Sequence, residues 1–330
     1  MTGDLLHGGA LDRMQAAFPD GPRPWIDLST GMNPWPYPAP APSPESLQHL
    51  PTRAAQDRCR HAMAQAFGAP EDSLVLAPGS ELLIRLLPQL ISPKRVALLN
   101  PTYGDHAQVW RRAGAIVIET DTPLALADTM DAIVLCNPNN PDGRQFSREE
   151  LETARETLAG RGGWLIVDEA YADLDPSLSV AGSGGAAGLI VLRSFGKFFG
   201  LAGVRLGAVL APACVRAALS DLLGEWPVSG PALELGAHAY EDHAWQSCAR
   251  VNLTAARERL DDLLLSAGFP GIQGTDLFRL VRCDDAHETW RLLAEAGLYV
   301  RRFAWSGHLL RIGLPATPQQ ERRLREALIP

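Results

Sequence analysis

The feature that most constrains the fold is a series of short apolar runs between residues 73 and 210. Valine, isoleucine and leucine fill these runs without alternating with polar residues, as at 95–99, 132–136 and 163–167. A strand with one face in water alternates, so continuous apolar runs indicate strands that are buried on both faces. Helical patterns separate the runs. We therefore expect an α/β fold with a mostly parallel sheet between helices.

The chain divides into a large and a small part on the same criteria. After residue 210 helical patterns dominate, and short strand and helix patterns then alternate to the C-terminus, which is typical of a small α+β unit. We expect a large domain over 45–225 and a small domain over 226–330, with residues 1–44 joining the small domain. Alternating prolines in 34–44 favour an extended crossing segment. Trp35 and Tyr37 within it favour an ordered strap over a disordered linker.

Composition argues against several classes of function. The 330 residues carry a net charge of −8, so the chain offers no basic stripe for nucleic acid. Its five cysteines are scattered singly, without the paired spacing of zinc sites or disulfide frameworks. No apolar run reaches the roughly 18 residues of a membrane span, and the N-terminus lacks a signal-peptide pattern. We expect a cytoplasmic protein without a metal, a membrane or a nucleic-acid partner.

Polar residues follow several of the apolar runs. Ser80 and Glu81 come after the first run, at the start of a helical pattern, where free backbone amides favour an anion. A tight strand-to-helix turn is the alternative. Asp168 ends another run, where a carboxylate is either a helix N-cap or a functional group with a cationic partner. Because ligands bind at the carboxyl edge of open α/β sheets, these exits predict a site.

The segment 193–207 offers the most reactive group. Lys197 lies among glycines and aromatics, where a poorly solvated amine is suited to attack carbonyls. Ser194 and Arg205 offer a hydroxyl and a fork donor that suit a phosphate. An aldehyde with a phosphate meets both requirements, which makes pyridoxal phosphate the expected cofactor. Val191 and Phe198 stand where a nucleotide P-loop requires glycine and serine or threonine, so that motif is absent. An ordinary surface lysine remains the other interpretation.

Three motifs in order extend this prediction to a family. They are Asn-Pro-Asn-Asn-Pro-Asp-Gly at 137–143, Asp-Glu-Ala-Tyr at 168–171, and Ser-Phe-Gly-Lys-Phe-Phe-Gly-Leu-Ala-Gly-Val-Arg-Leu-Gly at 194–207. Lys197 lies 29 residues after Asp168, and Arg205 lies 8 residues after Lys197. With these motifs and spacings the chain resembles the fold-type I pyridoxal phosphate enzymes of the aminotransferase class I and II superfamily, over nearly its whole length.

The resemblance implies a role for each matching residue. Lys197 would join the cofactor as a Schiff base, and Asp168 would pair with the pyridinium nitrogen. The remaining cofactor contacts implied are Asn140 and Tyr171 at the phenolic oxygen, Tyr103 on the ring face, and Ser194, Arg205 and the amides near Ser80 and Glu81 at the phosphate. Arg311 would bind either the carboxylate or the phosphate of the substrate.

The two ends of the chain resemble one branch of the superfamily. His7-Gly8-Gly9, the 29–34 loop and Leu-Leu-Arg-Ile-Gly-Leu-Pro at 309–315 are similar to the cobalamin-biosynthesis threonine-phosphate decarboxylases. That branch implies a homodimer that decarboxylates L-threonine O-3-phosphate to (R)-1-amino-2-propanol phosphate. His7, Asn33 and Arg323 are further candidate substrate contacts, although Arg323 on a basic helix face also fits a solvated charge.

Two other functions stay open at this point. One is an aminotransferase of the histidinol-phosphate type, because those enzymes share the cofactor motifs. They carry Arg-Tyr-Pro where this chain has His49-Leu50-Pro51, so the tyrosine contact to the partner subunit's cofactor is in doubt here. The other is a noncatalytic binding module with the same fold. The joint presence of Lys197, Asp168 and Arg205 argues against a module, which has no need of a Schiff-base lysine.

Overall fold

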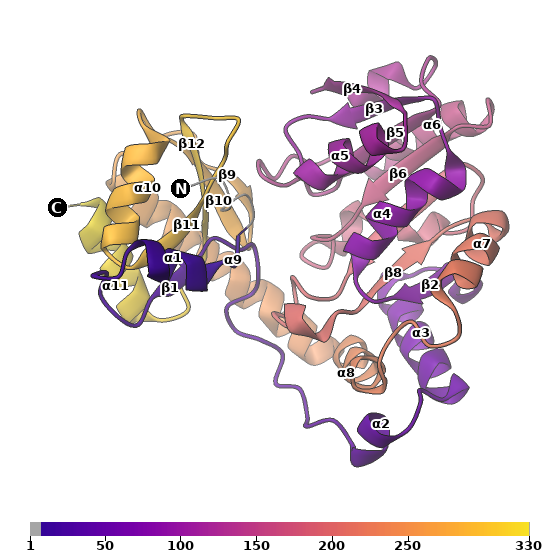
Figure 1. Ribbon diagram of the computed structural model, residues 1–330, viewed down its shortest axis with the longest axis horizontal. Coiled ribbons are helices and arrows are strands. Elements are labelled where there is room, and N and C mark those ends of the chain that lie inside the picture. The colour runs from indigo at the N-terminus through magenta and orange to yellow at the C-terminus, as the bar shows by residue number, and fades with distance from the viewer. Residues whose placement is uncertain (1–7, 330) are drawn as a thin grey trace. The chain divides into compact units, whose positions relative to one another are not determined.

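The computed structural model describes residues 8–329, and the chain forms two compact units (Figure 1). Unit 2 comprises residues 37–246, and unit 1 comprises the described residues before 37 and after 246. The sequence predicted changes of domain after residues 44 and 225. The later second change follows from packing: α8 (Gly230–Glu241) lies against α3 (Arg53–Phe67), where a Cβ on Gly236 would come within 3.2 Å of Cys59 Sγ.

Unit 2 contains a seven-stranded sheet in the order β2-β8-β7-β6-β5-β3-β4. All its strands run parallel except β8, which is antiparallel to both neighbours, so the mostly parallel sheet is confirmed. The strands are β2 (Leu74–Ala77), β3 (Arg95–Leu99), β4 (Ile116–Thr120), β5 (Ala132–Cys136), β6 (Trp164–Asp168), β7 (Leu189–Ser194) and β8 (Gly207–Leu210).

Strand order reverses between β3 and β5, because β4 lies outside β3 while β5, β6 and β7 follow on the other side. Such a reversal opens a crevice at the carboxyl ends of the strands. Tyr103 follows β3, Asn140 follows β5 and Asp168 ends β6. The topology therefore brings these three predicted residues to one edge of the sheet.

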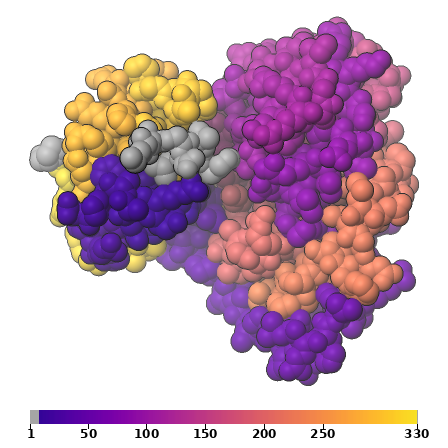
Figure 2. Space-filling model, viewed as in Figure 1, coloured from indigo at the N-terminus to yellow at the C-terminus, as the bar shows by residue number. Residues whose placement is uncertain are grey.

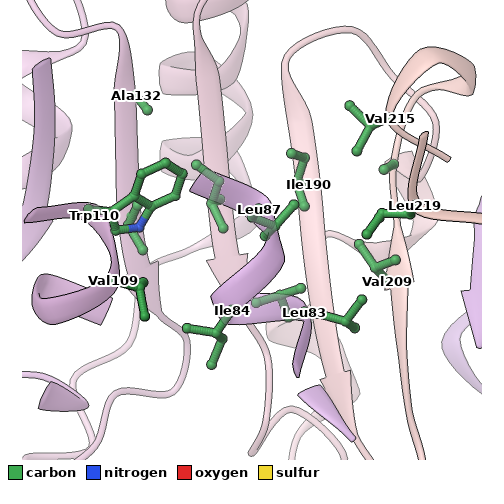
Figure 3. Close-up of a cluster of buried hydrophobic side chains, with 14 of the residues drawn as sticks. Leu83, Ile84, Leu87, Val109, Trp110, Ala132, Ile190, Val209, Val215 and Leu219 are labelled. Atoms are coloured by element: carbon green, nitrogen blue, oxygen red, sulfur yellow. The ribbon is translucent and has the colours of Figure 1, made fainter. Parts of the chain in front are cut away.

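Apolar side chains bury both faces of this sheet. On one face, Ile190 and Val209 pack against α4 (Ser80–Ile91), α5 (Gly104–Arg112) and α7 (Ala213–Leu223), as Figure 3 shows. Residues of opposite parity, such as Val167 and Val191, are equally buried on the other face, which α3 and α6 (Arg148–Ala159) contact. This two-sided burial explains why the strands lack alternation.

Capping residues and a proline set the bounds of the first two helices of unit 2. The start of unit 2 forms two helices, α2 (Pro44–Gln48) and α3, with Pro51 between them. Ser43 and Thr52 cap the two helices through their hydroxyl oxygens. Tyr37, at the end of the proline-rich segment, is buried, and its ring lies 5.1 Å from that of Trp245.

Unit 1 contains a five-stranded sheet in the order β1-β11-β12-β10-β9, in which only β1 and β11 are parallel. Its strands are β1 (Ile26–Leu28), β9 (Gln273–Thr275), β10 (Phe278–Arg282), β11 (Leu298–Arg302) and β12 (Leu309–Gly313). Its helices are α1 (Leu11–Ala17), most of α9 (His243–Ser266), α10 (Ala286–Glu295) and α11 (Pro318–Leu328). Within residues 8–329, no helix combines the length and apolar character needed to cross a bilayer.

Candidate cofactor and substrate site

The predicted phosphate contacts meet where β2, β8 and β7 lie side by side. Gly207 pairs with Ala77 on one side and with Ser194 on the other. A Cβ on Gly207 would lie 2.7 Å from the backbone nitrogen of Ser80, so only glycine allows this approach. No side chain caps the start of α4, and its first amides therefore remain suited to an anion.

Arg205 completes this cluster in an uncommon backbone conformation. Its φ of 55° lies in the left-handed region, which an arginine adopts at an energetic cost and which is frequent at functional sites. Its guanidinium lies against Gly79, where a Cβ would come within 2.8 Å of Nη2. The described residues give this guanidinium no hydrogen bond or ion pair. Ser80, Ser194 and Arg205 therefore form a set of donors that suits a phosphate.

The side chain of Glu81 points to a different partner. Its carboxylate accepts a hydrogen bond of 2.9 Å from Arg85, which also donates to Asp105. A carboxylate repels a phosphate, so only the backbone amide of Glu81 fits the predicted contact.

Lys197 lies in the turn after β7, between the buried Phe195 and Phe198. Phe195 stacks on Phe199 at 4.7 Å between ring centroids, so the turn is fixed by its own aromatic side chains. Within the part of the chain that the structure describes, the ammonium of Lys197 has no hydrogen-bond or ion-pair partner. The amine is thus available to a carbonyl compound.

Asp168 is buried at the end of β6, beside a histidine that the sequence interpretation missed. His106 Nε2 lies 3.0 Å from Asp168 Oδ2, and both side chains are almost inaccessible. An ionised carboxylate only accepts hydrogen bonds, so an ionised Asp168 requires the proton of this contact to be on Nε2. The carboxylate also accepts from the backbone nitrogen of Ala170 at 3.1 Å. One available signal was the position of His106, three residues after Tyr103 on α5.

Cys136 lies close to this pair, and the three possible metal ligands are within 4.8 Å of one another. Burial, followed by the charge of Asp168, raises the pKa of the Cys136 thiol well above its ordinary value. A protonated thiol is a poor metal ligand. The hydrogen bond between His106 and Asp168 therefore describes the cluster better than a metal centre does.

The other predicted ring contacts follow the ends of β3, β5 and β6. Tyr103 is the N-cap of α5, and its ring lies 6.0 Å from that of His106. Burial is the main cause of a raised pKa of Tyr103, which keeps its phenol neutral. Tyr171 is buried three residues after Asp168. Asn140 lies in a loop that is held in place, because Asn139 accepts a 2.7 Å hydrogen bond from Thr102.

Together these residues fit the shape and charge of pyridoxal phosphate. Donors suited to a phosphate lie where β2 and β7 end and β8 begins, and a buried carboxylate suited to a pyridinium ion lies on β6, the neighbour of β7. Gly79 and Gly207 leave room that a Cβ would fill. Lys197 follows Ser194 by three residues and offers the amine.

In unit 1, two of the predicted substrate contacts lie near one loop. Arg311 on β12 is buried, donates to the carbonyl oxygen of Ser29 at 2.7 Å, and has its guanidinium 4.9 Å from the Phe278 ring centroid. Asn33 is buried four residues after Ser29, and its Oδ1 accepts from the Trp35 nitrogen at 2.9 Å. The third candidate, His7, lies outside the described residues.

A second arginine lies next to Arg311. Arg301 is its direct partner in the β11–β12 register, so both side chains leave the sheet on the same face. Two adjacent arginines favour an anion with more than one negative charge. The sequence interpretation did not include Arg301, because arginines also occur at positions 302, 311 and 323 and sequence spacing does not rank them.

Arg323 lies at the other end of this sheet. Its nitrogens donate to the carbonyl oxygens of Pro22, Pro24 and Ala296, near the amino ends of β1 and β11. Arg311 pairs instead with the carboxyl-terminal part of β11. Because its donors are occupied by backbone, we do not include Arg323 in the substrate site; its contacts fit a structural clamp.

Comparisons with known proteins agree with this arrangement. The aminotransferase class I and II family matches residues 39–328. A threonine-phosphate decarboxylase of Sinorhizobium is 39% identical, covering 99% of this chain and 98% of its own, and one of Pseudomonas aeruginosa is 41% identical, covering 98% and 97%. A histidinol-phosphate aminotransferase of Xanthomonas axonopodis is 31% identical, covering 82% and 81%.

Solved structures confirm the fold. The histidinol-phosphate aminotransferase of Clostridium acetobutylicum superposes with a TM-score of 0.80 at 19% identity, covering 92% of this chain and 98% of its own. The motifs, the sheet order and the matches therefore lead to one assignment: the chain belongs to the aminotransferase class I and II family, the pyridoxal phosphate enzymes that it resembles in sequence.

Proposed function

We propose that this protein is a pyridoxal phosphate-dependent threonine-phosphate decarboxylase, which converts L-threonine O-3-phosphate to (R)-1-amino-2-propanol phosphate and carbon dioxide. The observation that carries the proposal is the match, over nearly the whole chain, to two threonine-phosphate decarboxylases. The aminotransferase relative is both less similar and aligned over less of the chain. The residues of unit 2 that suit pyridoxal phosphate, among them Lys197 and Asp168, support the same chemistry.

The bound cofactor supplies an electron sink for the pair left behind when the carboxylate departs. Asp168 holds a proton at the ring nitrogen, and His106 keeps that carboxylate oriented. Asn140 and Tyr171 are proposed to hold the phenolic oxygen, and Tyr103 to cover the ring. Ser194, Arg205 and the amides of Ser80 and Glu81 are proposed to hold the phosphate.

Lys197 has two roles in this proposal. Its amine would hold the cofactor between turnovers, and during turnover the same amine would return a proton to the substrate Cα at the position that the carboxylate leaves. Only a bond perpendicular to the cofactor ring breaks readily, so the choice of reaction depends on how the substrate's anionic groups are held. Arg311, Arg301, Asn33 and His7 are the residues we propose for that orientation.

The decisive experiment compares two substrate mixtures. Purified protein with pyridoxal phosphate and threonine phosphate should release carbon dioxide and form aminopropanol phosphate. With histidinol phosphate and 2-oxoglutarate it should form little glutamate. Glutamate formation without carbon dioxide release would establish the aminotransferase instead. A protein that binds the cofactor through Lys197 but turns over neither substrate would be a binding module.

We further propose a homodimer. Three large apolar side chains in unit 2 are exposed to solvent: Leu47 (68%), Leu50 (65%) and Trp226 (53%). The segments that carry them lie close together, since Gln56 donates to the carbonyl oxygen of Glu225 at 3.0 Å (Figure 2). Such exposed apolar side chains favour a subunit interface. Light scattering should give twice the mass of one chain, and a Leu50→Glu, Trp226→Glu variant should give a monomer. A monomeric wild type contradicts the proposal.

A cytoplasmic role in cobalamin biosynthesis is also proposed, with the phosphorylated amino acid as the small-molecule partner. All five cysteines are free thiols, which suits a reducing compartment. Expression in a bacterium that lacks its own threonine-phosphate decarboxylase should restore cobalamin synthesis, whereas a Lys197→Ala variant should not. Failure of the wild type to restore growth, although it is active in vitro, would contradict this role.

A further inference from the structure

A buried network of ion pairs lies in unit 2 at the ends of β6 and β7, next to the proposed cofactor residues Asp168 and Ser194. Arg193 is 2% exposed and donates to Glu169, which is completely buried, at 2.8 Å between Nη1 and Oε2. Its Nη2 donates to Asp173. Two carboxylates thus share one guanidinium, whose carbon lies 4.0 Å from the centroid of the Phe67 ring.

Other parts of the chain complete this network. Glu169 accepts from the backbone nitrogen of Val180 at 2.7 Å and from the hydroxyl of Ser179 at 2.5 Å. Arg193 also lies 3.3 Å from the Ser179 hydroxyl. The network therefore joins the exit of β6, the strand β7, the segment at 179–180 and helix α3.

Its members are the direct neighbours of proposed cofactor residues. Glu169 follows Asp168, and Arg193 precedes Ser194. Because successive side chains on a strand point to opposite faces, Asp168 and Ser194 lie on one face of the sheet, and Arg193 and Glu169 lie on the other. The backbone links the two strands here too, since Glu169 N donates to Leu192 O at 2.9 Å.

The surroundings do not require charge. Val167 and Val191 lie two residues before Glu169 and Arg193, on the same face of the sheet, and both are fully buried and apolar. Burying three ionisable groups in such a place costs desolvation free energy that an apolar replacement would avoid. Directional bonds from a planar guanidinium, however, fix positions that apolar contacts leave adjustable.

We propose that Arg193, held between Glu169 and Asp173, is a positioning residue that fixes the distance between Asp168 and Ser194, and so between the supports for the ring nitrogen and the phosphate of the cofactor. The inference rests on the proposed cofactor. It predicts that loosening the network weakens cofactor binding and tilts the ring, even where the fold survives.

The test measures pyridoxal phosphate affinity and the induced circular dichroism of the bound cofactor, together with the melting temperature of the cofactor-free protein. The variants are Arg193→Met, Glu169→Gln and Asp173→Asn. The control is Arg257→Met in unit 1, because Arg257 is also shared by carboxylates, here those of Glu258, Asp261 and Asp276 at 3.1 Å each. Asp173→Asn keeps the bond between Arg193 and Glu169, so it remains informative if Arg193→Met fails to fold.

We expect the dissociation constant of the cofactor to rise at least about tenfold in Arg193→Met and Glu169→Gln, and less in Asp173→Asn, with an altered cofactor dichroism. Arg257→Met should lower the melting temperature without either change. Unchanged affinity and dichroism in folded network variants, or equal changes in Arg257→Met, would overturn the inference. Failure of the wild type to bind the cofactor would instead contradict the proposed function.

Discussion

The two sheets differ in whether the cationic side chains at their ends have hydrogen-bond partners within the protein. At the carboxyl edge in unit 2, Lys197 and Arg205 have no hydrogen-bond or ion-pair partner among residues 8–329. In unit 1, Arg311 donates to the carbonyl of Ser29, and Arg323 donates to three carbonyls. The edge in unit 2 therefore leaves its positive charge available to a ligand, whereas the arginines at the two ends of the sheet in unit 1 also hold backbone.

Arg193 and Arg205 show the same contrast within one unit. Arg193 is paired through both terminal nitrogens with carboxylates in the interior, and Arg205 is exposed in a strained conformation beside Gly79. A buried arginine with its donors occupied contributes to architecture, while an arginine held in place without a protein partner is suited to an anionic ligand. Substituting an arginine that binds ligand should therefore change ligand affinity, whereas substituting an arginine that holds the protein together should change stability.

The largest effect should come from Lys197→Ala. Only two lysines occur in the chain, so Lys94→Ala is a matched control. Loss of both the covalent attachment and the proton donor should reduce kcat by at least about 10⁴-fold, while Lys94→Ala keeps wild-type turnover. Borohydride reduction followed by peptide mass spectrometry should find the cofactor on Lys197. Finding it on Lys94 would show that the site has been misassigned.

Asp168→Asn should have the next largest effect. An amide does not balance the positive charge of a protonated ring nitrogen, and loss of one partner of a buried pair costs about 3–5 kcal/mol, which corresponds to a kcat lower by about 160- to 5000-fold. The visible spectrum of the bound cofactor should change as well. Wild-type turnover in Asp168→Asn would exclude the carboxylate as the support of the ring.

The proposed cofactor residues could be named from sequence because each lies in a short local segment next to the end or the start of a strand. Its position three residues after Tyr103 does not identify His106 as the partner of Asp168, since their bond spans 62 residues and depends on the placement of β3 beside β5. The boundary between units falls inside the continuous helix α9, whose period is the same on both sides, so the sequence carries no signal there. The sheet itself was predictable because two-sided burial determines the composition of its central strands.

Arg311→Gln tests the ligand role of the unit 1 edge. Loss of the charged donor should raise the KM for threonine phosphate by about 10- to 100-fold, because a hydrogen bond to a charged group contributes about 1.5–3 kcal/mol. Cofactor affinity, measured by titration, should stay within about twofold. An unchanged KM would place the substrate's anionic groups elsewhere.

A smaller effect is expected for His106→Phe, which keeps a ring but removes the donor to Asp168. An unpaired carboxylate is less well oriented, so cofactor affinity should fall by about tenfold. His61→Phe is the control, because His61 makes a similar 2.9 Å contact to Glu71 on the surface. If both variants bind the cofactor as the wild type does, His106 does not support Asp168.

The smallest functional effect should come from Arg323→Gln, in which a long polar side chain loses the three-carbonyl clamp. Its KM for threonine phosphate should remain within about twofold of wild type, because the donors it loses bind backbone and not substrate. The same loss should lower the free energy of unfolding by about 1–3 kcal/mol, measured by denaturant titration. A raised KM with unchanged stability would reverse this assignment and return Arg323 to the substrate site. That outcome would also remove the distinction drawn between arginines that hold backbone and arginines that bind ligand.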